Sequence, residues 1–471
     1  MNTITPRTPS LRVSRRHLLG IGAGGVLASA LPASMAGARV LAPAWTTRRT
    51  PVRNIIFMAG DGMGQGSLTL GDIMLRVQGS EKPSHYRLLI EHSAVRRSTS
   101  LTHPADGWVT DSAAAGSAWG IGEHVNNRAI NFTPDAREPE PILVTARKLG
   151  KRTGLVTTTR LTHATPASFI ANVPKREMED EIAVQMLDRH VDVALGGGEK
   201  HFPAQLLAKH ADIHVVRDAA ALASAPDAGR LLGLFNHDHV PFEIDREPSC
   251  PSLEAMSLAA LDRLDRSPGG FVLQIEGGRI DHAAHDNDAI GLIYDQLAFD
   301  RAIGAVVQWV RGRDDTLLIV TSDHTTANPG LTFYGDDGRR SFKNLQNARH
   351  SFEWIAAQFK ASEQTPARFV ELAKEAAQVA LTAEDAAHLA RVFAESTQID
   401  PFNLANAQWS VLGSVLANHT GVAFLSPNHT SDHVEVLSIG PGSESLPPFI
   451  DNIHLHGMML AALGFEAGAP R

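Results

Sequence analysis

Cysteine is nearly absent from this chain: its 471 residues include one, Cys250. A single cysteine excludes an internal disulfide and a zinc site built from thiolates. Any bound zinc must therefore use histidine, aspartate and glutamate. The chain also lacks a basic run after its first fifty residues, and its net charge is −8. These two features argue against a nucleic-acid-binding domain and against a polybasic membrane surface.

The chain also lacks an apolar run long enough to cross a bilayer. The stretch Leu18–Leu31 is shorter than the about 20 residues that a membrane-spanning helix needs, so we expect no membrane span. It overlaps the twin-arginine pattern Ser14-Arg15-Arg16-His17-Leu18-Leu19 and is followed by small residues at Ala36-Gly37-Ala38. We interpret residues 1–38 as a twin-arginine signal peptide and 39–50 as a leader. A periplasmic or secreted protein is therefore predicted.

From Val52 onward, short apolar runs alternate with amphipathic segments of helical period. This alternation predicts an α/β fold with a large, mostly parallel central sheet and helices on both faces. The length leaves open one large domain with insertions or two domains. The expected strands are Asn54–Ala59, Gly154–Thr158, Val191–Leu195, Phe271–Ile275 and Thr316–Thr321. The expected helices are Pro141–Leu149, Met178–Leu187, Pro251–Leu264 and Ala289–Val310.

The pattern changes after Pro329. Tyr334–Arg349 is polar and contains glycine, and Ser351–Ala417 then shows only the helical period. Gly421–Leu425 and Val434–Ile439 have the character of strands again. We therefore predict that 331–420 is a helical insert, acting as a cap or an interface, and that 51–330 and 421–471 form the catalytic core.

Residues that bind metals or phosphate follow several of the expected strands. Asp61, His163, Glu276 and Asp323 each come shortly after an apolar run. In an open α/β sheet, ligands bind in the crevice outside the carboxyl ends of the strands. Several strands that deliver such residues to one edge predict a single site with more than one metal ion.

The segments around Asp61 and Ser112 also fit other functions. Asp61 lies in the glycine-rich turn Gly60-Asp61-Gly62-Met63-Gly64, but a dinucleotide loop has a different glycine spacing and no acid beside the phosphate. Ser112 follows Asp111 at the expected start of a helix, where it fits a plain N-cap or a nucleophile stabilised by the helix N-terminus. No G-x-S-x-G elbow surrounds Ser112, which argues against a Ser-His-Asp esterase.

The densest group of polar residues runs from Glu276 to His285. If a helix begins near Asp281, then Asp281 and His285 lie on one face and can share a metal ion. His282 projects about 100° away, and we expect it to be structural. Asp323 and His324 offer two adjacent ligands. His237, His239, His454 and His456 are expected to have no functional role.

These strings resemble the metal-dependent alkaline phosphatases. The matching segments run in family order from Asn54 to Gly440. They are Asp61-Gly62-Met63-Gly64, Thr110-Asp111-Ser112-Ala113-Ala114, Thr162-His163-Ala164-Thr165-Pro166-Ala167, Glu276-Gly277-Gly278-Arg279-Ile280-Asp281-His282, Ser322-Asp323-His324 and His429-Thr430. The resemblance implies the alkaline phosphatase fold and hydrolysis of small phosphate monoesters.

The resemblance also implies a role for each matched residue. Ser112 would be the nucleophile that forms a phosphoserine intermediate, and Arg176 would grip the phosphate, with Lys175 as the alternative. Two Zn²⁺ and one Mg²⁺ are implied: the first zinc would ionise the water that hydrolyses the intermediate, and the second would activate Ser112. The first zinc would be bound by Asp281, His285 and His429; the second by Asp61, Asp323 and His324; the magnesium by Asp61, Thr165 and Glu276. His163 is expected beside the third metal, and His433 is an alternative to His429.

Three other functions are weaker fits. A phosphodiesterase of the same superfamily tends to lack the third metal site that Thr165 and Glu276 would supply. A sulfatase needs a C/S-x-P-x-R string, and Cys250-Pro251-Ser252 is not followed by its arginine. A non-catalytic periplasmic protein that binds metal or phosphate would need neither Ser112 nor Arg176. Members of the resembled family are commonly homodimers, and the sequence does not fix the oligomeric state here.

Overall fold

The computed structural model describes residues 51–80, 82–395 and 407–465, all of which belong to one compact unit. The expected signal peptide and leader lie outside the described residues. Among the described helices, none combines the length and apolar character needed to cross a bilayer.

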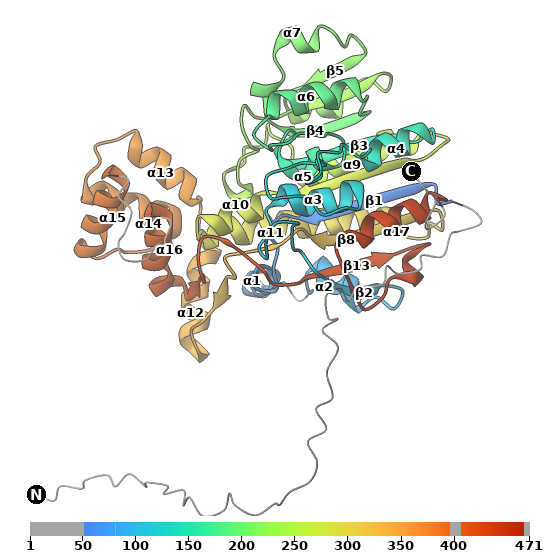
Figure 1. Ribbon diagram of the computed structural model, residues 1–471. Coiled ribbons are helices and arrows are strands. Elements are labelled where there is room, and N and C mark those ends of the chain that lie inside the picture. The colour runs from blue at the N-terminus through green and yellow to red at the C-terminus, as the bar shows by residue number, and fades with distance from the viewer. Residues whose placement is uncertain (1–50, 81, 396–406, 466–471) are drawn as a thin grey trace, which may run out of the picture. The chain divides into compact units, whose positions relative to one another are not determined.

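The main sheet has ten strands within the described part of the chain (Figure 1). From β5 to β8 all neighbours are parallel, and β13 is antiparallel to both β8 and β2. This is the large, mostly parallel sheet that the sequence predicts. Across the sheet the order is β14 (Phe449–Ile450), β2 (Arg96–Ser100), β13 (Val434–Ile439), β8 (Thr316–Ser322), β1 (Asn54–Gly60), β7 (Phe271–Gly277), β3 (Arg152–Arg160), β4 (Val193–Gly197), β6 (Arg230–Leu234) and β5 (Ile213–Val216).

The register of the central strands aligns their carboxyl ends. Gly60 at the end of β1 pairs with Gly277 of β7 on one side and with Ser322 of β8 on the other. The chain leaves β1 at Asp61 and β8 at Asp323, so both acids emerge at the same level. Glu276, expected just beyond its strand, is instead the penultimate residue of β7.

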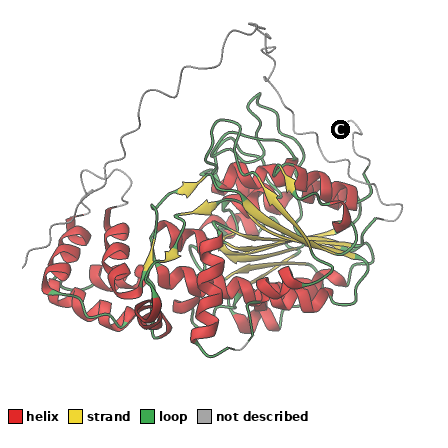
Figure 2. Ribbon diagram, turned by 90° about the horizontal axis from the view of Figure 1, so that it is seen from below, coloured by secondary structure: helices red, strands yellow, loops and turns green. Residues whose placement is uncertain are grey.

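Alternate residues of the strands feed two separate hydrophobic cores, one on each face of the sheet. Ile56 and Met58 of β1 pack in one core, whereas Ile55 and Phe57 pack in the other. Every residue of β1 is buried, as expected for a strand covered on both faces. Helices line both sides of the sheet (Figure 2).

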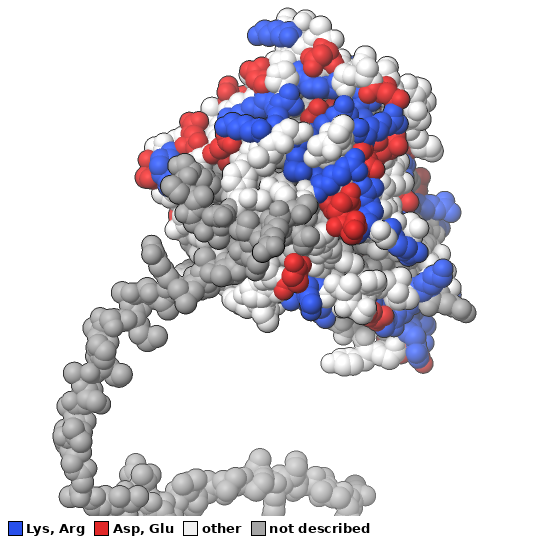
Figure 3. Space-filling model, turned by 90° about the vertical axis from the view of Figure 1, so that its right-hand side faces the viewer, with Lys and Arg blue, Asp and Glu red and all other residues white. Residues whose placement is uncertain are grey.

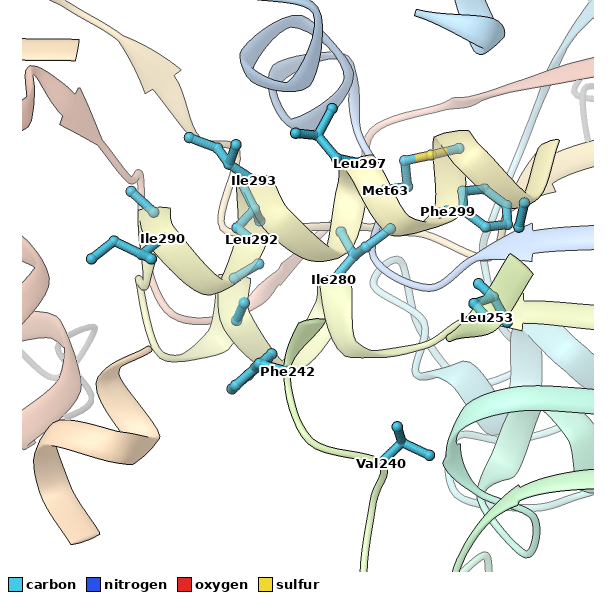
Figure 4. Close-up of a cluster of buried hydrophobic side chains, with 14 of the residues drawn as sticks. Met63, Val240, Phe242, Leu253, Ile280, Ile290, Leu292, Ile293, Leu297 and Phe299 are labelled. Carbon is cyan, nitrogen blue, oxygen red and sulfur yellow. The ribbon is translucent and has the colours of Figure 1, made fainter. Parts of the chain in front are cut away.

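Helices α1, α2, α9, α10 and α11 contribute to the core that contains Ile56, and α3, α4, α5, α6 and α17 contribute to the core that contains Phe57. Figure 4 shows part of the first core, in which Met63, Leu297 and Phe299 lie close together. The bounds are α1 (Gln65–Val77), α2 (His85–Glu91), α3 (Ser112–Ile121), α4 (Ile142–Lys148), α5 (Ala164–Ser168), α6 (Glu179–Asp188), α7 (Ala204–Leu207), α8 (Ala219–Ala223), α9 (Leu253–Asp265), α10 (Arg279–His285), α11 (Ala289–Val310) and α17 (His454–Ala462).

The segment expected to be an insert contains five helices in its described part. They are α12 (Gly335–Gln346), α13 (Phe352–Lys360), α14 (Pro366–Ala377), α15 (Ala383–Glu395) and α16 (Ala407–Thr420). Helix α12 begins within the polar stretch from Tyr334, and its buried residues are Gly338, Phe342 and Leu345. The strand expected at 421–425 is only β11 (Val422–Ala423), which pairs with β10 (Gly330–Leu331) rather than with the main sheet.

Charged side chains occupy the amino-terminal ends of several strands. Arg230, at the start of β6, binds the Asp212 carboxylate with two nitrogens and donates to the Leu187 carbonyl. Figure 3 shows the face on the right-hand side of Figure 1, where basic and acidic side chains are interspersed and the basic ones gather in the upper part. This face therefore carries charge of both signs.

Asp288 joins the helical segment to the core. Its buried carboxylate caps α11 by accepting from the N–H groups of Ile290 and Gly291 at 2.8 and 3.0 Å. The other oxygen accepts from the N–H of Phe352, the first residue of α13, at 2.7 Å.

Replacing Asp288 with alanine should lower the free energy of unfolding by about 2–4 kcal/mol, because a helix cap is lost and a buried N–H is left without a partner. The matched control is Asp218→Ala, which removes the cap of the short, exposed helix α8 and should cost about 1 kcal/mol or less. Denaturant unfolding compares the two, and equal losses would contradict the role of Asp288 in joining the segments.

Candidate metal centre and nucleophile

Three buried acids meet where the central strands end. Asp61, Glu276 and Asp323 are each no more than 1% exposed. The turn between β1 and α1 brings Gly62 N to within 3.0 Å of Asp323 Oδ1, to which it donates. Gly62 has φ +68°, and a Cβ there would lie 2.8 Å from Asp281 Oδ1. Only glycine fits this turn, which explains the glycine beside Asp61.

Ser112 is the first residue of α3, a fully buried helix of ten residues. Asp111 caps the helix by accepting from Ala114 N at 3.0 Å. The Ser112 hydroxyl therefore lies at the positive end of the helix dipole, where an anion is stabilised. Its Oγ is 3.2 Å from Nε2 of His324.

His324 connects Ser112 with the acids. The hydroxyl of Thr326 donates to Asp281 Oδ1 at 2.6 Å, so it accepts from His324 Nδ1 at 3.2 Å. Nε2 of the neutral ring is therefore unprotonated. This bare nitrogen faces Ser112, Asp323 Oδ2 at 3.1 Å and Asp61 Oδ1 at 3.6 Å.

A second group forms around Asp281. The α10 helix places Asp281 and His285 one turn apart, with His285 Nε2 3.4 Å from Asp281 Oδ2. His429 arrives on β12 (His429–Thr430), which pairs with β9 (Thr325–Thr326) directly after His324. Its Nε2 lies 3.6 Å from Asp281 Oδ1 and 2.8 Å from His285 Nε2.

The outer nitrogens of these two histidines are both fixed by carbonyls. His285 Nδ1 lies 2.6 Å from the Pro427 carbonyl, and His429 Nδ1 lies 2.7 Å from that of Thr110. A carbonyl only accepts, so each Nδ1 carries the proton and each neutral ring presents a bare Nε2. Two bare nitrogens and a carboxylate that converge in this way fit the ligand set of a zinc ion, with the outer contacts that orient metal-binding histidines.

A third group lies beside Asp61. Asp61, His163 and Glu276 present ligand atoms that all lie within 4.8 Å of one another, and Thr165 on α5 is fully buried. Glu276 Oε2 accepts from Thr157 and Thr159, which leaves Oε1 for another partner. His163 Nε2 accepts from Arg176 at 3.0 Å, so the proton of the neutral ring sits on Nδ1. His163 must release Arg176 or move this proton before it can bind a metal.

Arg176 is held near Ser112 by Asp111. Its NH1 donates to Asp111 Oδ2 at 2.9 Å, while the other carboxylate oxygen of Asp111 caps α3. Asp111 thus places the guanidinium next to the helix that carries Ser112. Lys175, the alternative to Arg176, is exposed.

Burial and mutual repulsion govern the charges of the acids. Burial raises the pKa of Asp61 well above its usual range, and the nearby Asp323 and Asp281 carboxylates raise it further. Burial also raises the pKa of Glu276 to about 7. Burial opposes ionisation of Asp281 too, but the contacts with the His285, His429 and His324 rings outweigh it and hold that pKa well below its usual value. Positive charge is therefore what stabilises these carboxylates.

Several atoms of these groups lack a hydrogen-bond partner within the described residues. They are both carboxylate oxygens of Asp61, Thr165 Oγ1, Glu276 Oε1, Asp323 Oδ2 and His163 Nδ1. Buried polar groups are almost always hydrogen-bonded. So many unsatisfied oxygens in one place fit metal ions as their partners. The donor atoms available are oxygen and imidazole nitrogen, which suit zinc and magnesium.

The positions of three other histidines bear on the sequence-based expectations. His433 is exposed and packs against Phe449, away from Asp281, so the geometry favours His429 in the alternative between them. His282, expected to be structural, lies with His239 and His163 in a cluster of three rings whose centroids are 4.4–5.5 Å apart. His239 reaches this cluster from the loop after β6, and no pattern in the sequence indicates its position.

Comparisons with known proteins place this geometry in context. A profile described as alkaline phosphatase matches residues 52–465. Alkaline phosphatase 4 of Bacillus subtilis (strain 168) is 32% identical over 419 residues, which cover 86% of this chain and 87% of that protein. Alkaline phosphatase 3 of the same organism is 31% identical over 436 residues, covering 88% and 90%. The crystal structure of Thermus thermophilus alkaline phosphatase superposes with a TM-score of 0.83 at 32% identity, covering 91% of this chain and 94% of that one.

His429→Ala should cost the protein about one bound zinc per chain and reduce kcat/KM at least about 100-fold, because one of two imidazole ligands is lost. His433→Ala is the matched control and should leave both values close to those of the wild type. The zinc content of the dialysed proteins then shows whether His429 or His433 binds the ion. Loss of zinc in His433→Ala but not in His429→Ala would reverse the assignment.

Proposed function

Because the chain belongs to the alkaline phosphatase family and is a phosphoric monoester hydrolase, we propose that it acts through a phosphoserine intermediate on Ser112. The observation that carries the proposal is the position of the Ser112 hydroxyl. It lies at the N-terminus of a buried helix and 3.2 Å from Nε2 of His324, a member of one of the groups that could bind a metal ion. The N-cap of this helix is Asp111, so Ser112 is not a plain N-cap.

The proposed metal sites follow the three groups of residues. Asp281, His285 and His429 would hold one Zn²⁺, and Asp61, Asp323 and His324 a second. Asp61, Thr165 and Glu276 would hold Mg²⁺, with His163 as a near neighbour. These ions would polarise the phosphoryl oxygens and lower the pKa of bound water.

The balance of charge favours a phosphate dianion as the substrate. Asp61, Glu276, Asp281 and Asp323 together carry four negative charges when they are ionised, and three divalent ions would carry six positive ones. The loaded site is then positive, so a dianionic monoester gains more from it than a monoanionic diester does. Thr165 and Glu276 would help to bind the third ion, which adds to the positive charge of the site. These two residues therefore favour a monoesterase over a phosphodiesterase.

The reaction is a double displacement at phosphorus. Ser112 Oγ forms a bond to phosphorus as the bond to the leaving alcohol breaks, and the alcohol takes up the proton that the serine gives up. Water then attacks phosphorus, the Oγ–P bond breaks, and inorganic phosphate and Ser112 are released. Arg176 would bind two phosphate oxygens with parallel N–H groups, and Asp111 keeps the guanidinium in place.

A non-catalytic phosphate- or metal-binding protein is the second candidate. It accounts for the ligand groups but not for a serine at a helix N-terminus against a bare imidazole nitrogen. We further propose that residues 1–38 direct export by the twin-arginine route, so that substrates are met in the periplasm or outside the cell. We also propose that the protein forms a homodimer and that it has no nucleic-acid-binding domain.

Ser112→Ala should lower kcat for an aryl phosphate monoester by at least about 1000-fold, because the nucleophile is lost. Acid quenching of the wild type during turnover should trap phosphate on Ser112, detectable by mass spectrometry. A Ser112→Ala protein that hydrolyses the monoester at the wild-type rate would disprove the intermediate. Faster turnover of the corresponding diester by the wild type would support the phosphodiesterase instead.

Arg176→Ala should reduce kcat/KM about 10- to 150-fold, because hydrogen bonds to charged groups contribute about 1.5–3 kcal/mol. Lys175→Ala is the matched neighbour and should change kcat/KM less than about twofold, since its side chain is exposed. The inhibition constant of inorganic phosphate should rise in the Arg176 variant alone. An unchanged phosphate affinity in Arg176→Ala would exclude a phosphate contact.

A further inference from the structure

A second group of metal-ligating side chains lies outside the centre described above. His103 is in the loop after β2, His124 follows α3, and Asp451 is between β14 and α17. One ligand atom from each lies within 4.8 Å of the other two. His124 Nε2 is 3.1 Å from Asp451 Oδ1, and His103 Nε2 is 3.8 Å from Asp451 Oδ2. Three segments far apart in the sequence thus converge on one point.

The ring proton of His103 is fixed by a backbone carbonyl, as are those of His285 and His429. Its Nδ1 lies 3.0 Å from the Pro104 carbonyl, which only accepts. The neutral ring therefore presents a bare Nε2 to the Asp451 carboxylate, which also has only lone pairs to offer. This arrangement is repulsive unless a cation lies between the two groups, and an outer contact of this kind is typical of metal-binding histidines.

Protonation of both rings is a poor alternative source of positive charge. The rings of His103 and His124 are stacked, with centroids 4.3 Å apart and planes at 27°. Two imidazolium ions this close repel each other strongly. Asp451 Oδ1 is buried and has no hydrogen-bond partner within the described residues. One cation would serve both ring nitrogens and the Asp451 carboxylate.

The ligand set and its spacing fit zinc. Tetrahedral zinc at about 2.0–2.1 Å from nitrogen and oxygen separates its ligand atoms by about 3.3 Å. Asp451 Oδ2 lies 3.2 Å from His124 Nε2 and 3.8 Å from His103 Nε2, and these two separations lie close to this value. The side chains of His103, His124 and Asp451 are 35%, 19% and 12% exposed, so an ion and a water ligand can reach them from solvent. We propose that His103, His124 and Asp451 form an additional zinc site.

Neighbouring residues support this site without binding the ion. His454, at the start of α17, accepts from the backbone N–H of Asp451 through Nδ1 at 3.3 Å. That contact orients the loop, and it occupies the nitrogen of His454 that faces Asp451. His454 was expected to have no role because no acid flanks it directly, yet Asp451 lies three residues before it.

The site would act as a structural clip at the C-terminal end of α3. It joins the loop after β2, the turn that ends α3 and the loop that precedes α17. Ser112 lies at the opposite end of the same helix, about 15 Å away at 1.5 Å per residue. Zinc in this position stabilises the folded chain and takes no part in the reaction. The inference therefore does not rest on the proposed function.

Metal analysis of the full-length protein tests the proposal, with His103→Ala and Asp451→Asn as the variants. The control is His92→Ala, which removes an exposed histidine outside the cluster. Each protein is saturated with zinc and magnesium, dialysed and measured by mass spectrometry. The wild type and His92→Ala should hold about one zinc per chain more than either cluster variant. Monoester turnover should be the same in all four, which shows that the catalytic metals are retained.

His103→Ala is the decisive variant, because His103 is the most exposed of the three and its removal disturbs the fold least. Zinc should also raise the Tm of the wild type more than that of His103→Ala. Equal zinc content in the wild type and His103→Ala would overturn the proposal and leave an ordinary group of hydrogen-bonded side chains. Failure of Asp451→Asn to fold would not alter this comparison.

Discussion

The need to stabilise four carboxylates at one buried edge of the sheet governs the architecture of this protein. Asp61, Glu276, Asp281 and Asp323 are each at most 4% exposed. Burying charges of one sign is prohibitively costly unless cations neutralise them. The carboxylates come together because the register of β1, β7 and β8 ends these strands at one level, and because Gly62 lets the chain turn beside Asp281. The strand register that forms the sheet therefore also brings together the carboxylates that need cations.

The same requirement explains why three histidines share one hydrogen-bonding pattern. His285 and His429 give their Nδ1 protons to backbone carbonyls, and His324 gives its own to Thr326. Each ring then presents a bare nitrogen to the acids. The carbonyl that fixes His429 belongs to Thr110, two residues before Ser112. One hydrogen bond thus joins the position of a proposed metal ligand to that of the proposed nucleophile.

The sequence predicted most of what depends on local chain order. Buried strands, their terminal acids and the Asp281–His285 spacing are local patterns, and the sheet with helices on both faces followed from them. Contacts made by irregular loops left no such signal. His239 reaches the rings of His163 and His282 from a loop, and Asp451 meets His103 across more than three hundred residues. The stretch that contains α12 showed no helical period, because Phe342 and Leu345 are the two large apolar side chains that this helix buries.

The close packing of α3 against α5 fixes the proposed nucleophile, Ser112, relative to Thr165. A Cβ at Gly116 would lie 2.5 Å from Ser168 Oγ, and one at Gly120 would lie 2.0 Å from the Ser168 carbonyl oxygen. These glycines let α3 approach the helix that carries Thr165 more closely than any other residue would allow. Beside Gly120, His456 Nδ1 bonds to the Trp119 carbonyl and ties the C-terminal end of α3 to α17. Asp111 caps the N-terminal end of α3. Because α3 is fixed by these contacts, Ser112 keeps its position among the charged groups, and a shift of the helix by about 1 Å would misplace the Ser112 hydroxyl.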